Sequence, residues 1–160
     1  MFATLVWATD GSEHADRALD YATQIADREH ARLHVVHIVE KIVSGRVAGQ
    51  NAFLNEDELD AKINAQARQV SAEHGIETTV YMTPSGTGNI GDRIADLATD
   101  AGADLIVVGT RGHSAIGELL LGSVTQRLMH VASCPVLAVP PVRAARTQPS
   151  EQPPAATTAS

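Results

Sequence analysis

The chain has 160 residues, a length that suits one domain with a sizeable core. Hydrophobic residues make up 44% of the chain and aromatic residues only 3%, which predicts a core built from aliphatic side chains. A formal net charge of -7 argues against general nucleic-acid binding, because such binding needs a basic face that neutralises phosphates.

The single cysteine, Cys134, cannot form an internal disulfide and has no metal-ligand spacing around it. Its place between a helix-like and a strand-like run predicts a small buried residue. No apolar stretch approaches the roughly 18 residues of a membrane span. Met1 leads into a strand-like segment without the basic region and cleavage site of a signal peptide. We therefore expect a cytoplasmic protein that binds no membrane.

The first half of the chain alternates strand and helix signals. Ala3 to Thr9 is an apolar run of strand length, and Asp10-Gly11-Ser12 separates it from a helix-like pattern that starts at Ser12. A second strand is predicted over Leu33 to Val39. The stretch Lys41 to Leu54 has no periodicity and is long enough to act as a lid. Asn55 and Glu58 are predicted to cap a second helix, which stops near Gly75.

The second half continues the alternation. It predicts a strand over Ile76 to Met82, a helix over Ile90 to Ala101, a strand over Leu105 to Val108, a helix from about Ser123 and a last strand over Pro135 to Val139. Unbroken apolar strands that alternate with helices indicate an α/β protein with a parallel sheet covered on both faces. Ligands of such sheets bind beyond the carboxyl ends of the strands, where the strand order reverses.

The C-terminal segment has a different composition. Val142 to Ser160 is rich in proline, alanine, threonine and serine and lacks apolar periodicity. We predict a disordered tail there. The domain organisation is therefore one folded domain over residues 1–141 and a tail over residues 142–160.

The most informative motif is a set of glycines after the fourth predicted strand. Gly109 and Gly112 would let the backbone approach an anion closely, and Gly122-Ser123 would open a helix whose N-terminus attracts the same anion. Ser123 and Gln126 have the spacing of a capping box. Ordinary turn chemistry is the alternative. Side chains that can donate to phosphate favour the anion site, namely Arg111, Ser114, Ser123 and Thr125.

Two other glycine runs imitate nucleotide motifs. Gly86 to Gly91 matches GxGxxG, but it follows the third strand and lacks the acidic residue that would bind a ribose about 20 residues later. Gly117 to Ser123 imitates a P-loop without its spaced glycine and lysine. Lys41 and Lys62 are the only lysines, and neither is near such a turn in sequence, which excludes a P-loop NTPase.

The Asp-Gly-Ser after the first strand and the pattern Gly-x2-Gly-x9-Gly-Ser after the fourth resemble the universal stress protein family, over roughly Phe2 to Pro140. The glycine pattern resembles its ATP-binding branch. The resemblance implies a five-stranded parallel sheet of order 3-2-1-4-5, a Rossmann-like fold of the adenine nucleotide alpha hydrolase type. It also implies a homodimer formed through Pro135 to Val139.

The resemblance further implies roles for individual residues. Ala8, Thr9 and Asp10 would border the adenosine and the metal-bound phosphates, Ile38 would read the adenine edge through its main chain, and Val108 would pack on the base or ribose. The ribose and phosphates would be wrapped by Gly109, Arg111, Gly112, Gly122, Ser123, Val124 and Thr125. ATP carries about four negative charges and Arg111 is the obvious cation, so Mg²⁺ held by Asp10 is the natural companion.

Some assignments stay open at this level. Asp10 suits a metal or ribose ligand and also a helix N-cap. His37 is interpreted as a packed strand histidine. An ATP-binding regulator of an unknown protein partner is the first hypothesis, and a cyclic AMP-binding protein suits a site with one arginine. A nucleotidyl-transfer or ATP-cleaving enzyme is the third. We expect no enzyme, or at most a weak ATPase, because no second carboxylate or glutamine is spaced to reach a γ-phosphate.

Overall fold

The structure is a computed structural model that describes residues 1–39, 56–84, 88–112 and 121–142. Strands and helices alternate along these residues. The strands are Thr4–Thr9 (β1), Arg32–Val39 (β2), Thr78–Pro84 (β3), Leu105–Gly109 (β4) and Val136–Val139 (β5). The helices are Glu13–Glu29 (α1), Glu56–His74 (α2), Ile90–Asp100 (α3) and Ser123–Val131 (α4). The predicted lid, Lys41 to Leu54, and the tail beyond Val142 lie outside the described residues.

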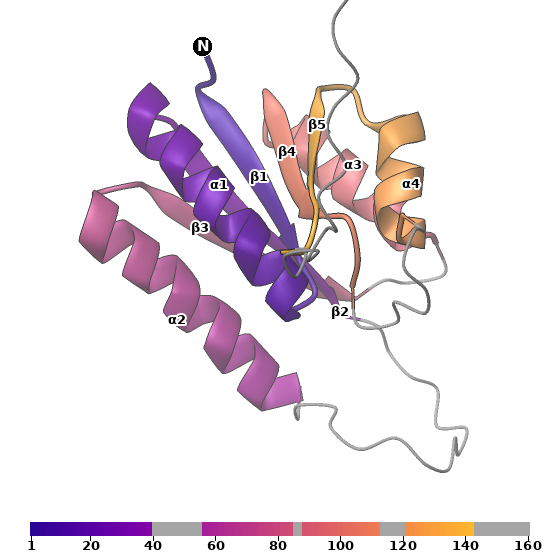
Figure 1. The fold of residues 1–160 in the computed structure, drawn as a ribbon, viewed down its shortest axis with the longest axis horizontal. Coiled ribbons are helices and arrows are strands. Elements are labelled where there is room, and N and C mark those ends of the chain that lie inside the picture. The colour runs from indigo at the N-terminus through magenta and orange to yellow at the C-terminus, as the bar shows by residue number, and fades with distance from the viewer. Residues whose placement is uncertain (40–55, 85–87, 113–120, 143–160) are drawn as a thin grey trace, which may run out of the picture.

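The strands form one parallel sheet in the order β3-β2-β1-β4-β5 (Figure 1). This order confirms the prediction. β1 lies at the centre, and its residue Ala8 is paired with Val36 of β2 and with Val108 of β4. The strand order reverses between β1 and β4, because β2 and β3 extend to one side of β1 and β4 and β5 to the other.

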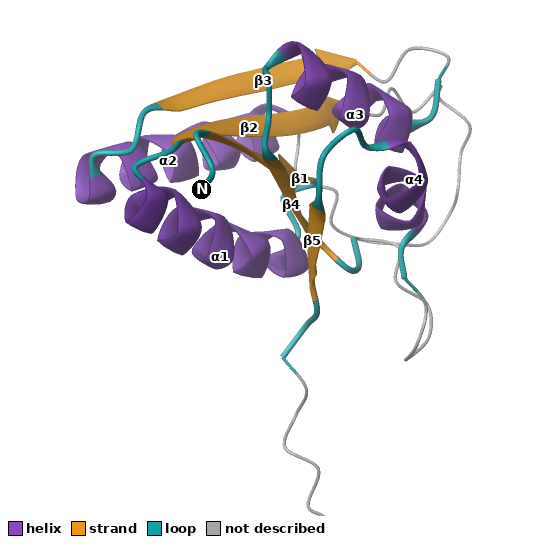
Figure 2. Ribbon diagram, turned by 90° about the horizontal axis from the view of Figure 1, so that it is seen from above, coloured by secondary structure: helices purple, strands orange, loops and turns teal. Residues whose placement is uncertain are grey.

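Helices cover both faces of the sheet, as predicted (Figure 2). α1 and α2 pack on one face against Leu5 and Trp7, and α3 and α4 pack on the other face against Val6 and Ala8. Successive side chains of a strand point to opposite faces. Every residue of β1 is buried for this reason, and the strand reads as an unbroken apolar run instead of an alternating one.

The predicted element boundaries need one clear correction. β3 begins at Thr78 and ends at Pro84, two residues later than the predicted run of Ile76 to Met82. Ile76 is buried because it belongs to the core beneath α1 and α2, and the ladder with β2 starts only after it, at Leu33 and Thr78. An apolar residue that fills the core just before a strand cannot be told from a strand residue by its hydrophobicity.

Two further predictions concern surface and core. Cys134 is half-buried, less than predicted, and it packs against the core beneath α3 and α4. Burial raises the pKa of the Cys134 thiol, which therefore stays protonated at neutral pH.

No helix in the described part of the chain combines the length and the apolar composition that crossing a membrane requires.

Candidate functional site

The candidate site lies at the carboxyl ends of β1 and β4, which are neighbours in the sheet. The turn from β1 leads into α1 on one face, and the chain after β4 leads to α4 on the other. The two connections therefore diverge above the boundary between the strands. Parallel α/β sheets bind their ligands in the crevice at such a reversal. All twelve residues predicted to bind a nucleotide lie at or near this edge of the sheet.

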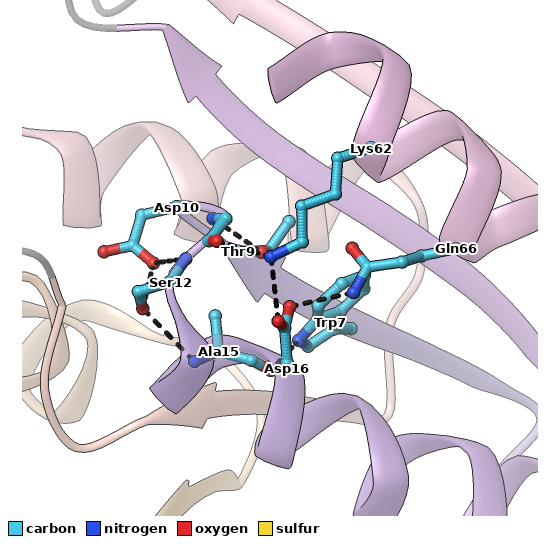
Figure 3. Close-up of polar contacts among 9 residues, drawn as sticks. Trp7, Thr9, Asp10, Ser12, Ala15, Asp16, Lys62 and Gln66 are labelled. Carbon is cyan, nitrogen blue, oxygen red and sulfur yellow. Dashed lines mark hydrogen bonds and ion pairs between the residues drawn. The ribbon is translucent and has the colours of Figure 1, made fainter. Parts of the chain in front are cut away.

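The β1–α1 turn is organised by its own side chains (Figure 3). Gly11 has a φ of 77°, a conformation that favours glycine, and its N–H donates to Thr9 Oγ1 at 3.0 Å. The Asp10 Oδ1 atom accepts hydrogen bonds from Ser12 N at 3.0 Å and from Ser12 Oγ at 2.6 Å. Ser12 Oγ in turn accepts from Ala15 N at 3.3 Å. Ser12 is therefore the N-cap of α1, and the N-cap interpretation of Asp10 is wrong.

The second carboxylate oxygen of Asp10 lies beside the other turn. A Cβ placed on Gly112 would overlap Asp10 Oδ2. The turn after β1 therefore lies against the turn after β4, and the carboxylate lies beside one of the glycines that the sequence predicts to approach an anion. In the described residues no group of three or more His, Cys, Asp or Glu side chains is placed to hold a metal ion. A single carboxylate suits Mg²⁺ when phosphate oxygens supply the other ligands.

Gly109 is required by the protein's own packing. A Cβ on it would stand 2.9 Å from the His14 carbonyl oxygen, in the first turn of α1. The Gly109 carbonyl accepts a hydrogen bond from Thr125 Oγ1 at 2.8 Å, and Gly122 N donates to Thr110 O at 2.8 Å. These two bonds place the start of α4 over the end of β4. The Thr125 hydroxyl donates its proton to the Gly109 carbonyl. The backbone amide of Thr125 is therefore the donor of this residue that is left at the N-terminus of α4.

The N-terminus of α4 has the features of an anion site. Gly122 is its N-cap and provides no side-chain cap, so Ser123 is the first helical residue and the predicted capping box with Gln126 is wrong. Helix geometry leaves the amides of Ser123, Val124 and Thr125 without an intrahelical acceptor. The first turn has no acidic residue, and the helix dipole adds a partial positive charge there.

Gly122 differs from the other two glycines of the motif. A Cβ on it would lie 3.4 Å from Thr110 O, an ordinary contact, and its φ of -60° is accessible to any residue. Neither backbone strain nor internal packing therefore requires glycine at this position. A ligand that approaches the helix N-terminus closely would require it.

The residues assigned to the base form part of one apolar cluster. Ala8, Ile38 and Val108 come from three adjacent strands, and all three are buried in the core beneath α3 and α4. Their side chains are therefore taken up by the core. His37 is buried, and its Nδ1 forms a hydrogen bond of 2.9 Å with Thr9 O. It is thus a packed strand histidine, as predicted.

Arg111 is half-buried between Gly109 and Gly112, but a second cation reaches the site that sequence reasoning missed. Lys62 of α2 donates from Nζ to Gly11 O at 2.7 Å and to Asp16 Oδ2 at 2.8 Å. It is 51 residues from Gly11 in sequence. The sequence contains a weak signal of this contact, because Lys62 follows Leu59 by three positions and so lies on the same side of the helix. That spacing indicates a contact with the β1–α1 turn only once the position of α2 is known.

The GxGxxG run has a structural explanation at its last glycine. A Cβ on Gly91 would stand 2.7 Å from Arg127 Cβ, so glycine is needed where α3 packs on α4. A Cβ on Gly88 would meet nothing within 4 Å. Gly86 and Ser114 lie outside the described residues. Close helix packing, and not a dinucleotide, accounts for Gly91.

Comparison with known proteins decides the family. Residues 1–140 match the model of the universal stress protein family. The chain belongs to the universal stress protein family. A universal stress protein of Thermus aquaticus is 36% identical over 141 residues, which cover 87% of this chain and 99% of that protein.

Two solved universal stress proteins carry nucleotides. One, in complex with cAMP, is 28% identical, has a TM-score of 0.62 and covers 86% of this chain and 96% of its own. The other, from Archaeoglobus fulgidus in complex with dAMP, is 25% identical, has a TM-score of 0.61 and covers 87% and 98%. Some proteins with this fold therefore bind adenine nucleotides.

Proposed function

We propose that this universal stress protein binds ATP at the carboxyl edge between β1 and β4 and regulates a partner protein according to nucleotide occupancy. The observation that carries the proposal is the N-terminus of α4, which presents three amides beside a glycine that the fold itself does not require. Asp10 stands at the adjacent turn. The nucleotides in two solved relatives support an adenine nucleotide as the ligand.

Different residues of the candidate site would bind different parts of ATP. The strand ends at Ala8, Ile38 and Val108 would meet the adenine and ribose. The amides of Ser123, Val124 and Thr125 would bind phosphate oxygens, with Arg111 as a nearby cation. Mg²⁺, when bound, would neutralise part of the triphosphate charge, and Asp10 would hold it from the protein side. A carboxylate next to bare phosphates would repel them, which favours ATP with Mg²⁺ over ATP alone.

Cyclic AMP is the second candidate ligand. It carries one negative charge, which a helix N-terminus and Arg111 can balance without a metal. The relative that was solved in complex with cAMP supports this alternative. The two ligands differ in their need for Mg²⁺, so competition between them with and without the metal distinguishes the alternatives.

The proposal is one of binding rather than turnover, with ATP hydrolysis slow or absent. It includes a cytoplasmic location and a homodimer. β5 is at the edge of the sheet, and its residues Val136, Leu137 and Ala138 are half-buried in the single chain. An open edge strand of this kind can pair with a second copy.

The test is calorimetric titration of the purified protein with ATP and with cAMP, each with and without Mg²⁺. Gly122→Val places methyl groups where phosphates are expected and should lower ATP affinity by about tenfold or more, or about 1.4 kcal/mol. Gly88→Val is the matched control, because that position is open, and it should bind like the parent protein. Parent protein that binds neither nucleotide, or Gly122→Val that binds ATP unchanged, would overturn the proposal.

A further inference from the structure

Two residues of α2, Leu59 and Lys62, contact the turn that precedes α1, and Figure 3 shows the contact of Lys62. Lys62 Nζ lies 2.7 Å from the carbonyl oxygen of Gly11. A Cβ on Gly11 would overlap Leu59 Cδ1, so Leu59 packs directly on the glycine. α2 therefore contacts Gly11 with an apolar side chain and with a cation. Gly11 itself is the residue between Asp10 and the N-cap Ser12.

The same helix also holds the carboxylate of Asp16. Lys62 Nζ donates to Asp16 Oδ2 at 2.8 Å, and Gln66 Nε2 donates to Asp16 Oδ1 at 2.8 Å. Each carboxylate oxygen thus has a partner on α2. The side chains of Lys62 and Asp16 remain about one-third exposed, at 33% and 32%. Ion pairs as exposed as this one stabilise a fold by about 1 kcal/mol at most, so overall stability is a poor account of the arrangement.

The bond to Gly11 O has a local consequence that the ion pair lacks. Gly11 has a φ of 77° and no Cβ, so its flanking peptide groups rotate with less steric resistance than those of other residues. A charge-assisted hydrogen bond to its carbonyl fixes the orientation of the peptide group that links Gly11 to Ser12. The Ser12 amide on that peptide donates to Asp10 Oδ1. Lys62 therefore helps to set where the Asp10 carboxylate stands.

We infer that Lys62 is a positioning residue of the candidate site, which holds the β1–α1 turn in its binding conformation and thereby couples nucleotide occupancy to the docking of α2. This inference rests on the proposed nucleotide binding. By linkage, a nucleotide that requires the held turn also favours the docked helix, so occupancy is transmitted to a surface element away from the ligand. α2 is thus the element through which a partner would sense the bound state.

A different role for Lys62 would be that of a positive charge that attracts phosphates at long range. The two roles predict different results. A charge effect weakens with salt and acts on ATP with or without Mg²⁺. A positioning effect acts through Asp10, so it persists in salt and is larger when Mg²⁺ is present. Lys62→Met removes the contact and the charge, whereas Arg68→Met removes one positive charge from an exposed position of the same helix and is the matched control.

The first arm of the test needs no ligand. Hydrogen exchange of the Gly11 and Ser12 amides is measured in the parent protein, in Lys62→Met and in Arg68→Met. We expect exchange to be several-fold faster in Lys62→Met and unchanged in Arg68→Met, because the turn opens locally when Lys62 no longer holds it. Equal rates in all three proteins would overturn the inference, whether or not the parent binds nucleotide.

The second arm measures the affinity for ATP with and without Mg²⁺, at low and high salt. We expect Lys62→Met to lose about fivefold or more in the presence of Mg²⁺ at both salt concentrations, which is the lower range of coupling between sites. The change without Mg²⁺ should be smaller. Lys62→Arg should restore most of the affinity, and ATP should slow amide exchange in α2. A loss confined to low salt and equal with and without Mg²⁺ would overturn the positioning role in favour of a charge effect.

The arms separate this inference from the proposed function. A parent protein that does not bind ATP while Lys62→Met opens the turn would overturn nucleotide binding, and with it the coupling. If Lys62→Met binds ATP as tightly as the parent protein does, nucleotide binding stands and the role of Lys62 is overturned.

Discussion

The Asp10 carboxylate and Gly112 lie in contact across the boundary between β1 and β4, so close that the glycine has no room for a Cβ. Each residue belongs to a different turn, and the two turns are about 100 residues apart in sequence. The contact explains why the two motifs of the chain depend on each other. Asp10 can keep this position beside the proposed phosphate site only if its neighbour is glycine.

Gly112→Ala should therefore displace the Asp10 side chain. We expect ATP affinity in the presence of Mg²⁺ to fall by about tenfold, or about 1.4 kcal/mol, because the carboxylate leaves the position at which it would hold the ion. Affinity for ATP without Mg²⁺ should change less. Titration calorimetry with and without the metal checks this, and an equal loss under both conditions would contradict it.

Gly109→Ala should destabilise the fold itself. The new Cβ would stand 2.9 Å from His14 O, a backbone atom that cannot rotate away. Overpacking of this kind costs about 1–3 kcal/mol. Urea denaturation should report a loss of that size. Gly88→Ala, at an open position, is the control and should unfold at nearly the same urea concentration as the parent protein.

Gly91→Ala should separate α3 from α4. Its Cβ would approach Arg127 Cβ to 2.7 Å and Val124 O to 3.1 Å. We expect a loss of about 1–3 kcal/mol in the free energy of unfolding. Arg127→Gly removes the first of these contacts, so the double variant should recover part of that loss beyond the sum of the single effects. Strict additivity in a double-mutant cycle would show that the two positions do not share a contact.

The stability of the protein should fall in acid partly through Asp104. Hydrogen bonds from Ala3 N at 2.8 Å and Thr4 N at 3.0 Å favour the charged carboxylate and hold its pKa below the ordinary value of 3.8. The stabilisation is therefore complete above that value and is lost as the pH falls through the lower, folded-state pKa. Asp104→Ala should be less stable than the parent at pH 7, and the difference should shrink toward pH 2. A difference that is independent of pH would argue against this role.

The sequence predicted most of the fold because its local signals agree with one another. The apolar runs at β1 and β4, the turn residues Asp10-Gly11-Ser12 and the helical spacing after them all indicate the same alternation. The strand order came from the family resemblance, since hydrophobic periodicity contains no information on which strands are neighbours. The match of residues 1–140 to the family model and the observed order confirm that resemblance.

The site was harder to predict than the fold. The capping box at Ser123 was wrong because a one-residue shift of the helix start moves the serine from the N-cap to the first helical position. Sequence spacing could not choose between the roles of Asp10, and only the structure excludes the N-cap role, because Ser12 caps α1. Lys62 was missed because a lysine on an amphipathic helix usually faces water, and only tertiary packing brings it to Gly11.

Trp7 is the single tryptophan of the chain, and its side chain extends from β1 into the core beneath α1, where it is fully buried. Its indole Nε1–H donates to Ala15 O at 3.0 Å, in the first turn of α1 and a few residues from the Asp10 turn. The indole is thus a built-in fluorophore for this region. Its fluorescence emission maximum should be at short wavelength in the native protein and should shift to longer wavelength when water enters beneath α1. The β1–α1 unit thus has an optical signal that needs no label.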